Sequence, residues 1–136
     1  MKAIVALVAL LAVGQAPPAA APVKVSQRDF KRLAAAQKIL ILDVRPATAF
    51  RDGHILRAIS LPLERGHWLA EYDATVERLK TAVKPIVIYC ACSGETLSIE
   101  AADLLSEAGV HQDMRVLRGG WNTWVNDGSR VVTGPK

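Results

Sequence analysis

Hydrophobic residues along this chain gather into short apolar runs that alternate with longer amphipathic segments. Two runs, KILILDV at 38–44 and KPIVIYC at 84–90, are continuous and rich in β-branched or bulky residues, which is typical of strands covered on both faces. Two shorter runs, ISLPL at 59–63 and MRVL at 114–117, predict further strands, and Pro62 places the first of them at an edge or at a strand end.

The segments between these runs carry apolar residues at helical spacing. Ser26 and Asp29 form an N-cap signal ahead of Phe30, and Gly109 follows a long apolar face as a C-terminal stop. The predicted helices cover 26–37, 68–83, 94–109 and 119–128, with one further helical turn within 45–54. Strands that alternate with helices in this way predict an α/β fold, with a mostly parallel sheet and helices on both faces. Ligands bind such sheets outside the carboxyl ends of the strands.

The first residues, MKAIVALVALLAVGQAPPAAAP, have the three-part layout of a secretory signal peptide. A charge at Lys2 precedes an apolar stretch at 3–13, which is short for a membrane-spanning helix, and small residues and prolines follow. We therefore expect residues 1–22 to be a signal peptide and a Pro/Ala-rich leader. Residues 23–136 are then one domain that works in the periplasm or outside the cell. An uncleaved anchor or a buried first helix is the alternative.

The composition fits one compact domain with its own core, since 51% of the residues are hydrophobic and 22% are charged. The formal net charge is +4, but Lys and Arg are scattered among acidic residues instead of forming one stripe. This distribution argues against nucleic-acid binding and suggests only a mild preference for small anions. We expect no membrane partner once the signal peptide is removed.

Both cysteines of the chain, Cys90 and Cys92, stand where the strand predicted at 84–90 gives way to a helix. Free N–H groups of the loop and of the first helical turn point at a sulfur in this position, so the pKa of such a thiol falls below its ordinary value. The small residues of ACSGETLS let the backbone curl into an anion-binding nest. The arrangement suits a cysteine that carries a transferable sulfur or attacks an oxyanion. A lone cysteine at this place would more simply fill the end of a core strand.

Three stretches in the right order resemble the rhodanese (sulfurtransferase) family, over nearly all of the chain after the leader. They are ILDVRPATAFRDGHILRAISLPL at 41–63, IVIYC at 86–90 and VLRGGWNTWVNDG at 116–128. The resemblance implies the rhodanese fold, a five-stranded parallel sheet flanked by helices, with the catalytic cysteine opening a loop that cradles the substrate. We expect no cofactor, and no metal, because the cysteine pair has no obvious third Cys or Met ligand nearby.

The resemblance does not decide between the two cysteines. Cys90 follows IVIY as the family's nucleophile does, whereas counting back from Ser98 along the family's loop pattern gives Cys92. We favour Cys90, because phosphatases that share this fold also have a longer loop after the cysteine. The expected anion-binding loop comprises Ala91, Ser93, Gly94, Glu95, Thr96, Leu97 and Ser98.

The loop lacks the arginine that, in the family, helps to bind the sulfonate end of thiosulfate. Leu97 stands at that position, and the other polar side chains of the loop offer neutral hydroxyls and one carboxylate. A persulfide or polysulfide is therefore a better expected donor than thiosulfate. Arg65 and Arg118, which lie outside the loop, are candidate replacements for the missing cation.

The Cys-x-Cys spacing suggests that one thiol accepts a sulfane sulfur as a persulfide and that the other resolves it, releasing sulfide and closing a disulfide. Such a disulfide closes a small ring and should be easily reduced. Asp43 and Arg45, at another strand end, are expected to form a buried hydrogen-bonded pair that supports the site. His54 fits a hydrogen-bonded turn histidine better than a general base.

The sequence thus predicts an exported sulfurtransferase that moves sulfane sulfur from a thiosulfate- or polysulfide-type donor, through a cysteine persulfide, to a thiol or cyanide acceptor. A thiol reductase or a sulfur-accepting protein is the expected protein partner. The alternative is a non-catalytic rhodanese module that binds a protein or senses redox state through the Cys pair, and a thiol-reductase or metal-binding role for the pair is a third hypothesis.

Overall fold

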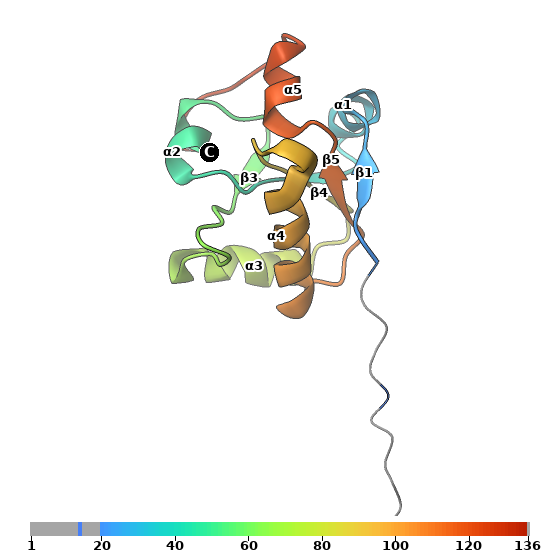
Figure 1. Cartoon of the computed structure of the whole chain (residues 1–136), viewed down its shortest axis with the longest axis vertical. Coiled ribbons are helices and arrows are strands. Elements are labelled where there is room, and N and C mark those ends of the chain that lie inside the picture. The colour runs from blue at the N-terminus through green and yellow to red at the C-terminus, as the bar shows by residue number, and fades with distance from the viewer. Residues whose placement is uncertain (1–13, 15–19, 136) are drawn as a thin grey trace, which may run out of the picture.

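The computed structural model describes residue 14 and residues 20–135, and within them five strands form one parallel sheet. The spatial order is β1-β5-β4-β2-β3, which places β4 at the centre (Figure 1). The strands are β1 (Val23–Val25), β2 (Leu40–Asp43), β3 (Ala58–Ser60), β4 (Ile86–Tyr89) and β5 (Met114–Leu117). This is the parallel α/β architecture that the alternation of apolar runs and amphipathic segments predicts.

Four α-helices connect these strands, and a fifth follows β5. They are α1 (Gln27–Ala35), α2 (Ala47–Asp52), α3 (Asp73–Lys80), α4 (Thr96–Glu107) and α5 (Gly120–Asn126). Short 3-10 turns precede two of them, η1 (Ala70–Tyr72) before α3 and η2 (Ser93–Glu95) before α4. The predicted N-cap is present, because the Ser26 hydroxyl accepts a hydrogen bond from the Asp29 N–H at 3.1 Å. None of the helices in this part of the chain is long and apolar enough to cross a membrane.

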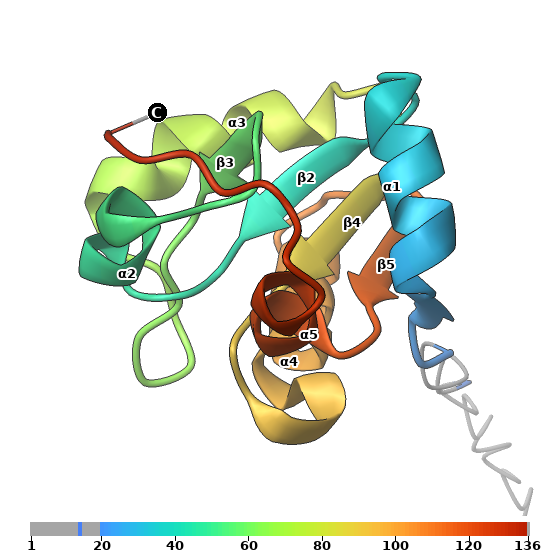
Figure 2. The same cartoon turned by 90° about the horizontal axis from the view of Figure 1, so that it is seen from above.

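The sheet lies between two layers of helices, which Figure 2 shows from above. Alternate residues of β2 and β4 point to opposite faces, so each strand feeds two separate cores. Leu42 and Ile88 pack with residues of α3 and α4 on one face. Ile41 and Val87 pack on the other face with Phe30 and with residues of α2 and α5. Burial on both faces explains why these strands are continuously apolar.

Two elements differ from those predicted. β1 was not predicted, because its three residues follow the Pro/Ala-rich leader and only Val25 is buried. It is nevertheless paired in parallel with β5, with Val23 opposite Arg115. The helix predicted at 68–83 is shorter: Leu69 is extended, a 3-10 turn follows, and the regular α-helix ends at Lys80. The predicted signal peptide lies almost entirely outside the described residues.

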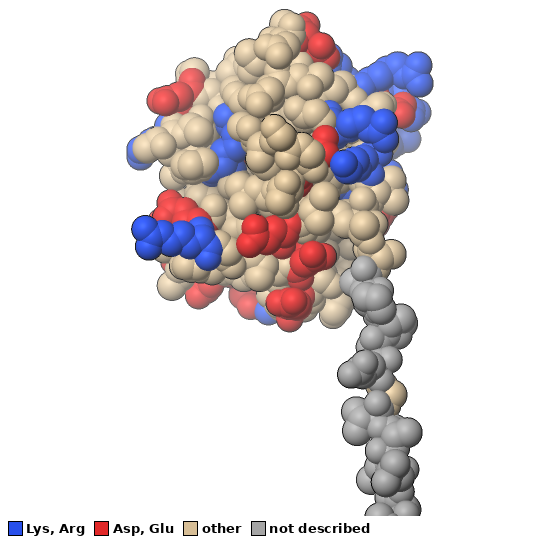
Figure 3. Space-filling model, viewed as in Figure 1, with Lys and Arg blue, Asp and Glu red and all other residues tan. Residues whose placement is uncertain are grey.

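The carboxyl ends of the strands point toward the loops that lead into α2, α4 and α5. Figure 3 shows that the surface over the first turns of α4 and α5 is mostly uncharged, with basic side chains grouped beside it over β1 and α1. The candidate site lies within this uncharged region.

Candidate active site

The two cysteines form a disulfide at the carboxyl end of β4. Cys90 is the first residue after the strand and is 1% exposed, whereas Cys92 directly precedes η2 and is half-buried. Their Cα atoms are 5.6 Å apart, which is within the ordinary range for a disulfide. The described chain therefore contains no free thiol, and the pair can carry sulfur only after reduction.

A backbone amide of the helix N-terminus points at one of the two sulfurs. The N–H of Leu97, in the first turn of α4, donates to Sγ of Cys92 at 3.3 Å. This N–H has no partner within the helix, and the helix dipole adds positive potential at the same end. The donor expected from the strand-to-helix transition is thus found at Cys92, which is also the more accessible of the pair.

Two consecutive residues of the cysteine loop have left-handed backbone conformations. Gly94 has φ 66° and Glu95 has φ 58°. Glycine adopts this conformation without cost, but a side chain such as that of Glu95 adds roughly 1–2 kcal/mol. Contacts of the Glu95 side chain offset that cost.

Glu95 is buried and binds two segments distant in the sequence. Its Oε2 accepts a hydrogen bond from Nζ of Lys24 in β1 at 2.7 Å, and its Oε1 accepts one from the N–H of Gly119 at 2.7 Å. The Glu95 side chain is 8% exposed and that of Lys24 is 40% exposed. The hydrogen bonds from Lys24 and Gly119 lower the pKa of the Glu95 carboxyl, so it is ionised at neutral pH. The Glu95 carboxylate therefore joins the loop to β1 and to the turn before α5 by hydrogen bonds.

Other loop residues close the turn. The Thr96 hydroxyl donates to the Ser93 carbonyl at 3.2 Å, and the carbonyl of the exposed Ala91 accepts from Nδ2 of Asn122 at 3.2 Å. Ser98 is fully buried, and its hydroxyl has no hydrogen-bond partner among the described residues.

Arg118 is the candidate cation whose charge acts on the loop. It immediately precedes Gly119, is exposed, and its charge contributes to the lowered pKa of Glu95. Arg65 is exposed in the turn between β3 and α3. The structure supplies no arginine from within the loop itself, where Leu97 is half-buried.

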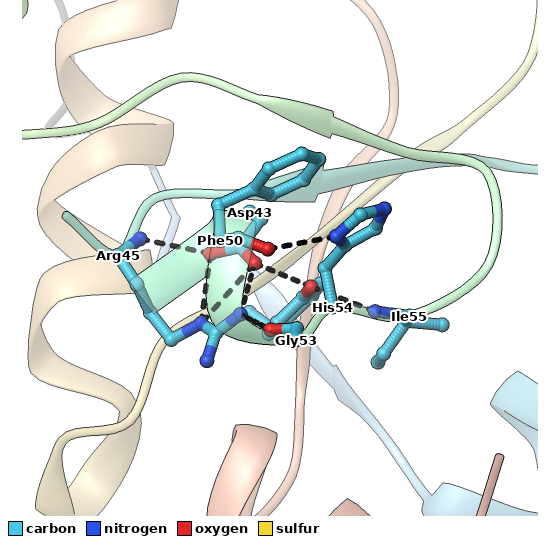
Figure 4. A network of polar contacts seen from close by, with 7 residues as sticks. Asp43, Arg45, Phe50, Gly53, His54 and Ile55 are labelled. Carbon is cyan, nitrogen blue, oxygen red and sulfur yellow. Dashed lines mark hydrogen bonds and ion pairs between the residues drawn. The ribbon is translucent and has the colours of Figure 1, made fainter. Parts of the chain in front are cut away.

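A buried polar network fixes the neighbouring strand end. Asp43 accepts hydrogen bonds from Nε and Nη2 of Arg45, at 3.0 and 2.6 Å, and from the Tyr89 hydroxyl (Figure 4). The same guanidinium donates to the Gly53 carbonyl at 2.7 Å. Asp43, Arg45 and Tyr89 are all nearly or fully buried. Burial, and next the Asp43 carboxylate, raise the pKa of Tyr89 well above its ordinary value, so the phenol stays protonated and acts as a donor.

This network reaches the cysteines through the start of α5. The guanidinium carbon of Arg45 lies 3.8 Å from the ring centre of Trp121, whose backbone N–H donates to the Cys90 carbonyl at 2.9 Å. A Cβ on Gly120 would lie 2.3 Å from the same carbonyl oxygen, so only glycine fits there. Gly120 and Trp121 thus hold the backbone at the start of α5 against the Cys90 carbonyl.

The remaining polar and aromatic residues of interest have structural partners. His54 is buried, stacks on Phe50 and donates from Nδ1 to the Phe50 carbonyl at 2.8 Å, as expected of a structural histidine. Trp68 packs against the core beside α3, and its Nε1 donates to Asp73 at 3.1 Å. The described residues hold no cluster of three or more possible metal ligands. A groove of about 550 Å³ beside β3, lined in part by Arg51 and Arg78, does not include either cysteine.

Sequence reasoning did not identify Lys24 or Tyr89 as part of the site. Lys24 is 71 residues from Glu95, and no local pattern links them. Tyr89 interrupts an otherwise aliphatic strand directly before Cys90, and this polar aromatic position was the available signal.

The family model for the rhodanese-like domain matches residues 26–127. Among solved structures, a protein of Bacillus halodurans is 26% identical, with a TM-score of 0.68, and the match covers 83% of this chain and 78% of that one. A rhodanese-related protein of Thermoplasma volcanium is 22% identical, with a TM-score of 0.60, over 81% of this chain and 97% of that one. A thiosulfate sulfurtransferase of Pseudomonas aeruginosa is 19% identical, with a TM-score of 0.61, over 83% of this chain but only 20% of that one. No curated protein matches the chain.

Proposed function

The chain belongs to the rhodanese-like domain family, and we propose that it is a sulfurtransferase that carries sulfane sulfur as a persulfide on its Cys90–Cys92 pair. The observation that carries the proposal is the position of the pair, at the carboxyl end of a buried central strand, with a helix N-terminal amide directed at Sγ of Cys92. Ligands bind parallel α/β sheets at this edge.

The environment of the pair favours a thiolate once the disulfide is reduced. The Leu97 amide donates to sulfur, and the first turn of a twelve-residue helix supplies positive potential. The Glu95 carboxylate nearby is balanced by Lys24 and by the Gly119 amide, so its negative charge opposes the thiolate less than an unpaired one would. A thiolate is the form that attacks a sulfane sulfur.

The substrate class follows from the same contacts. A loop without an arginine offers thiosulfate no forked cation for its sulfonate end, and Arg118, which is exposed, lies outside the loop. A polysulfide or a persulfide presents a sulfane sulfur without a sulfonate, so we propose this class as the better donor. In transfer, the cysteine thiolate bonds to the sulfane sulfur and the rest of the donor leaves with the electron pair of the broken S–S bond. A thiol or cyanide then takes the sulfur and restores the thiolate.

We also propose that the protein is exported, on the basis of the signal-peptide layout of residues 1–22. Expression of the full gene product in a bacterial host, with intact mass measured on the periplasmic fraction, tests this. A mature form that lacks the apolar stretch supports export, and a full-length chain confined to the cytoplasm contradicts it.

Cyanolysis tests the sulfurtransferase. The full chain is reduced, desalted and given cyanide with either thiosulfate or polysulfide, and thiocyanate is measured. We expect activity with polysulfide that exceeds activity with thiosulfate, and none in the Cys90→Ser/Cys92→Ser double variant. A matched control returns one cysteine to that double variant at exposed Ala74 of α3, where no loop surrounds the sulfur. Equal activity in this control, or none with either donor in both the reduced wild type and Cys90→Ser, would contradict the proposal.

The second candidate is a redox-sensing module without turnover. The observation that favours it is the disulfide, which engages both cysteines of the chain. A wild type that produces no thiocyanate but changes its binding to a partner between the oxidised and reduced forms would support this function.

A further inference from the structure

We infer that the two cysteines have different roles, and that the protein thereby reduces sulfane sulfur to sulfide: Cys92 accepts the sulfur and Cys90 expels it as sulfide by closing the disulfide. This inference rests on the proposed persulfide chemistry and adds a second activity to it.

The first argument is accessibility. An incoming polysulfide must reach the sulfur that attacks it, and Cys90 is 1% exposed while Cys92 is half-buried. The backbone of Gly120 packs so closely on the Cys90 carbonyl that a Cβ would not fit between them. The same carbonyl accepts a hydrogen bond from the Trp121 N–H. Cys92 lies between Ala91 and Ser93, which are both exposed. The geometry therefore favours Cys92 as the acceptor, although the motif order favours Cys90.

The second argument is the distribution of hydrogen-bond donors. The loop amide that reaches sulfur, that of Leu97, reaches Cys92. An N–H directed at sulfur stabilises the thiolate that attacks, and later the charged persulfide formed on it.

The third argument is reach. The disulfide shows that Sγ of Cys90 can bond to Sγ of Cys92 with the strand, the loop and the helix N-terminus all in place. A sulfur that can bond to its neighbour in the folded state is also placed to displace a group from it.

The steps balance as follows. In the first, the Cys92 thiolate attacks the terminal sulfane sulfur of a polysulfide, a Cys92–S–S bond forms, and the shortened polysulfide leaves with the electron pair. In the second, the Cys90 thiol loses its proton and attacks Sγ of Cys92. The Sγ–Sγ bond forms, the outer S–S bond breaks, and the outer sulfur leaves with that electron pair and the proton as hydrosulfide. Two thiols are thus oxidised to one disulfide while one sulfane sulfur is reduced to sulfide.

Regeneration needs an external dithiol reductant. Its first thiolate attacks Sγ of Cys92, the exposed sulfur, and Cys90 leaves as the thiolate. Its second thiol then displaces Cys92, so the reductant becomes a disulfide and the pair is restored. The cycle therefore requires a supply of dithiol, and its product is sulfide.

A single-turnover experiment without reductant tests the assignment. Reduced and desalted full chain is mixed with polysulfide, excess donor is removed, sulfide is measured against a protein-free control, and the protein is analysed by intact mass and by peptide mapping. In the wild type we expect about one extra sulfide per chain and a Cys90–Cys92 disulfide. In Cys90→Ser we expect a stable added sulfur on Cys92 and no extra sulfide, and in Cys92→Ser no added sulfur.

The opposite results overturn the inference. They are a stable persulfide on the wild type, or an added sulfur on Cys90 in the Cys92→Ser variant with none on Cys92 in Cys90→Ser. Because Cys90 is buried, Cys90→Ala is tested in parallel, and circular dichroism confirms that each variant is folded. Cyanide added to loaded Cys90→Ser separates the two proposals. Thiocyanate release there, together with a wild type that yields no extra sulfide, leaves the sulfurtransferase standing and removes the reductase, whereas no loading of any variant removes both.

Discussion

Two aspartate–arginine pairs in this fold allow a direct measurement of what burial does to an ion pair. Asp43 pairs with Arg45, and Asp113 pairs with Arg115, each at a separation of two residues. The side chains of the first pair are 0% and 5% exposed, whereas those of the second are 50% and 34% exposed. Asp43→Asn and Asp113→Asn are therefore the same chemical change in two environments.

The structure sets the expected magnitudes. Asp43→Asn leaves the buried Arg45 guanidinium without its counter-charge. The amide NH₂ that replaces one carboxylate oxygen is itself a hydrogen-bond donor, so it cannot accept from the Arg45 guanidinium. Removing one partner of a buried pair costs about 3–5 kcal/mol. Asp113→Asn should cost about 0–1 kcal/mol, because water screens and solvates both partners. At about 4 °C per kcal/mol for a domain of this size, the buried variant should melt roughly 12–20 °C lower than the wild type.

Urea unfolding of the purified chain, followed by tryptophan fluorescence, measures both free energies of unfolding by linear extrapolation. If Asp43→Asn does not accumulate, Tyr89→Phe removes the hydrogen bond to the same carboxylate and the one that the hydroxyl accepts from the Ile55 N–H, and should cost about 1.5–3 kcal/mol. Equal losses in Asp43→Asn and Asp113→Asn would refute the reasoning, because burial would then make no difference to the pair.

Two further predictions concern the loop and its neighbours. Gly120→Ala should destabilise the fold by about 1–3 kcal/mol more than Gly128→Ala in the same urea assay, because a Cβ at Gly120 meets the Cys90 carbonyl while one at Gly128 meets nothing within 4 Å, and both residues have positive φ; equal losses would exclude the steric argument. Glu95→Gln should lose roughly 1–2 kcal/mol at pH 7, and Glu107→Gln, an exposed carboxylate on α4, less than about 0.5 kcal/mol. The fold lowers the pKa of Glu95, so its contribution is complete above the ordinary carboxyl pKa and is lost as the pH falls through the folded value. Unfolding measured from pH 7 to 3 should therefore show the Glu95→Gln curve converging on the wild type in acid, and a constant offset would contradict this.

The sequence predicted those parts of the fold that depend on local pattern. The continuous apolar runs identified β2 and β4 because both of their faces are buried, and Ser26 with Asp29 identified the start of α1. β1 escaped prediction because three residues at a sheet edge, one of them buried, carry no periodic signal. A short edge strand of this kind forms because it pairs with its neighbour, here β5, and its own residues do not reveal it.

The candidate site shows the same limit. The strand-to-helix turn predicted where the cysteines lie and that an amide would face a sulfur. Which sulfur it faces depends on the left-handed turn at Gly94 and Glu95, and the motif order favoured the other cysteine. The Lys24–Glu95 contact joins residues that are 71 positions apart in the sequence, so no spacing rule could suggest it. The Asp43–Arg45 pair, by contrast, lies within three residues, and its burial followed from the strand that precedes it.

β1 and β5 come from opposite ends of the described chain, and their pairing constrains the order in which the strands of the domain assemble. During synthesis Val23 emerges first, yet its partner Arg115 follows only after all of β2, β3 and β4. Strands β2, β3 and β4 can pair with one another earlier, but Lys24 reaches Glu95 only when β1 docks on β5, since long-range parallel pairing forms late. The Lys24–Glu95 contact, which holds the loop of Cys90 and Cys92, is thus completed together with the last strand pairing of the sheet. Any truncation or fusion that disturbs the segment at 23–25 acts on that loop from the far end of the polypeptide.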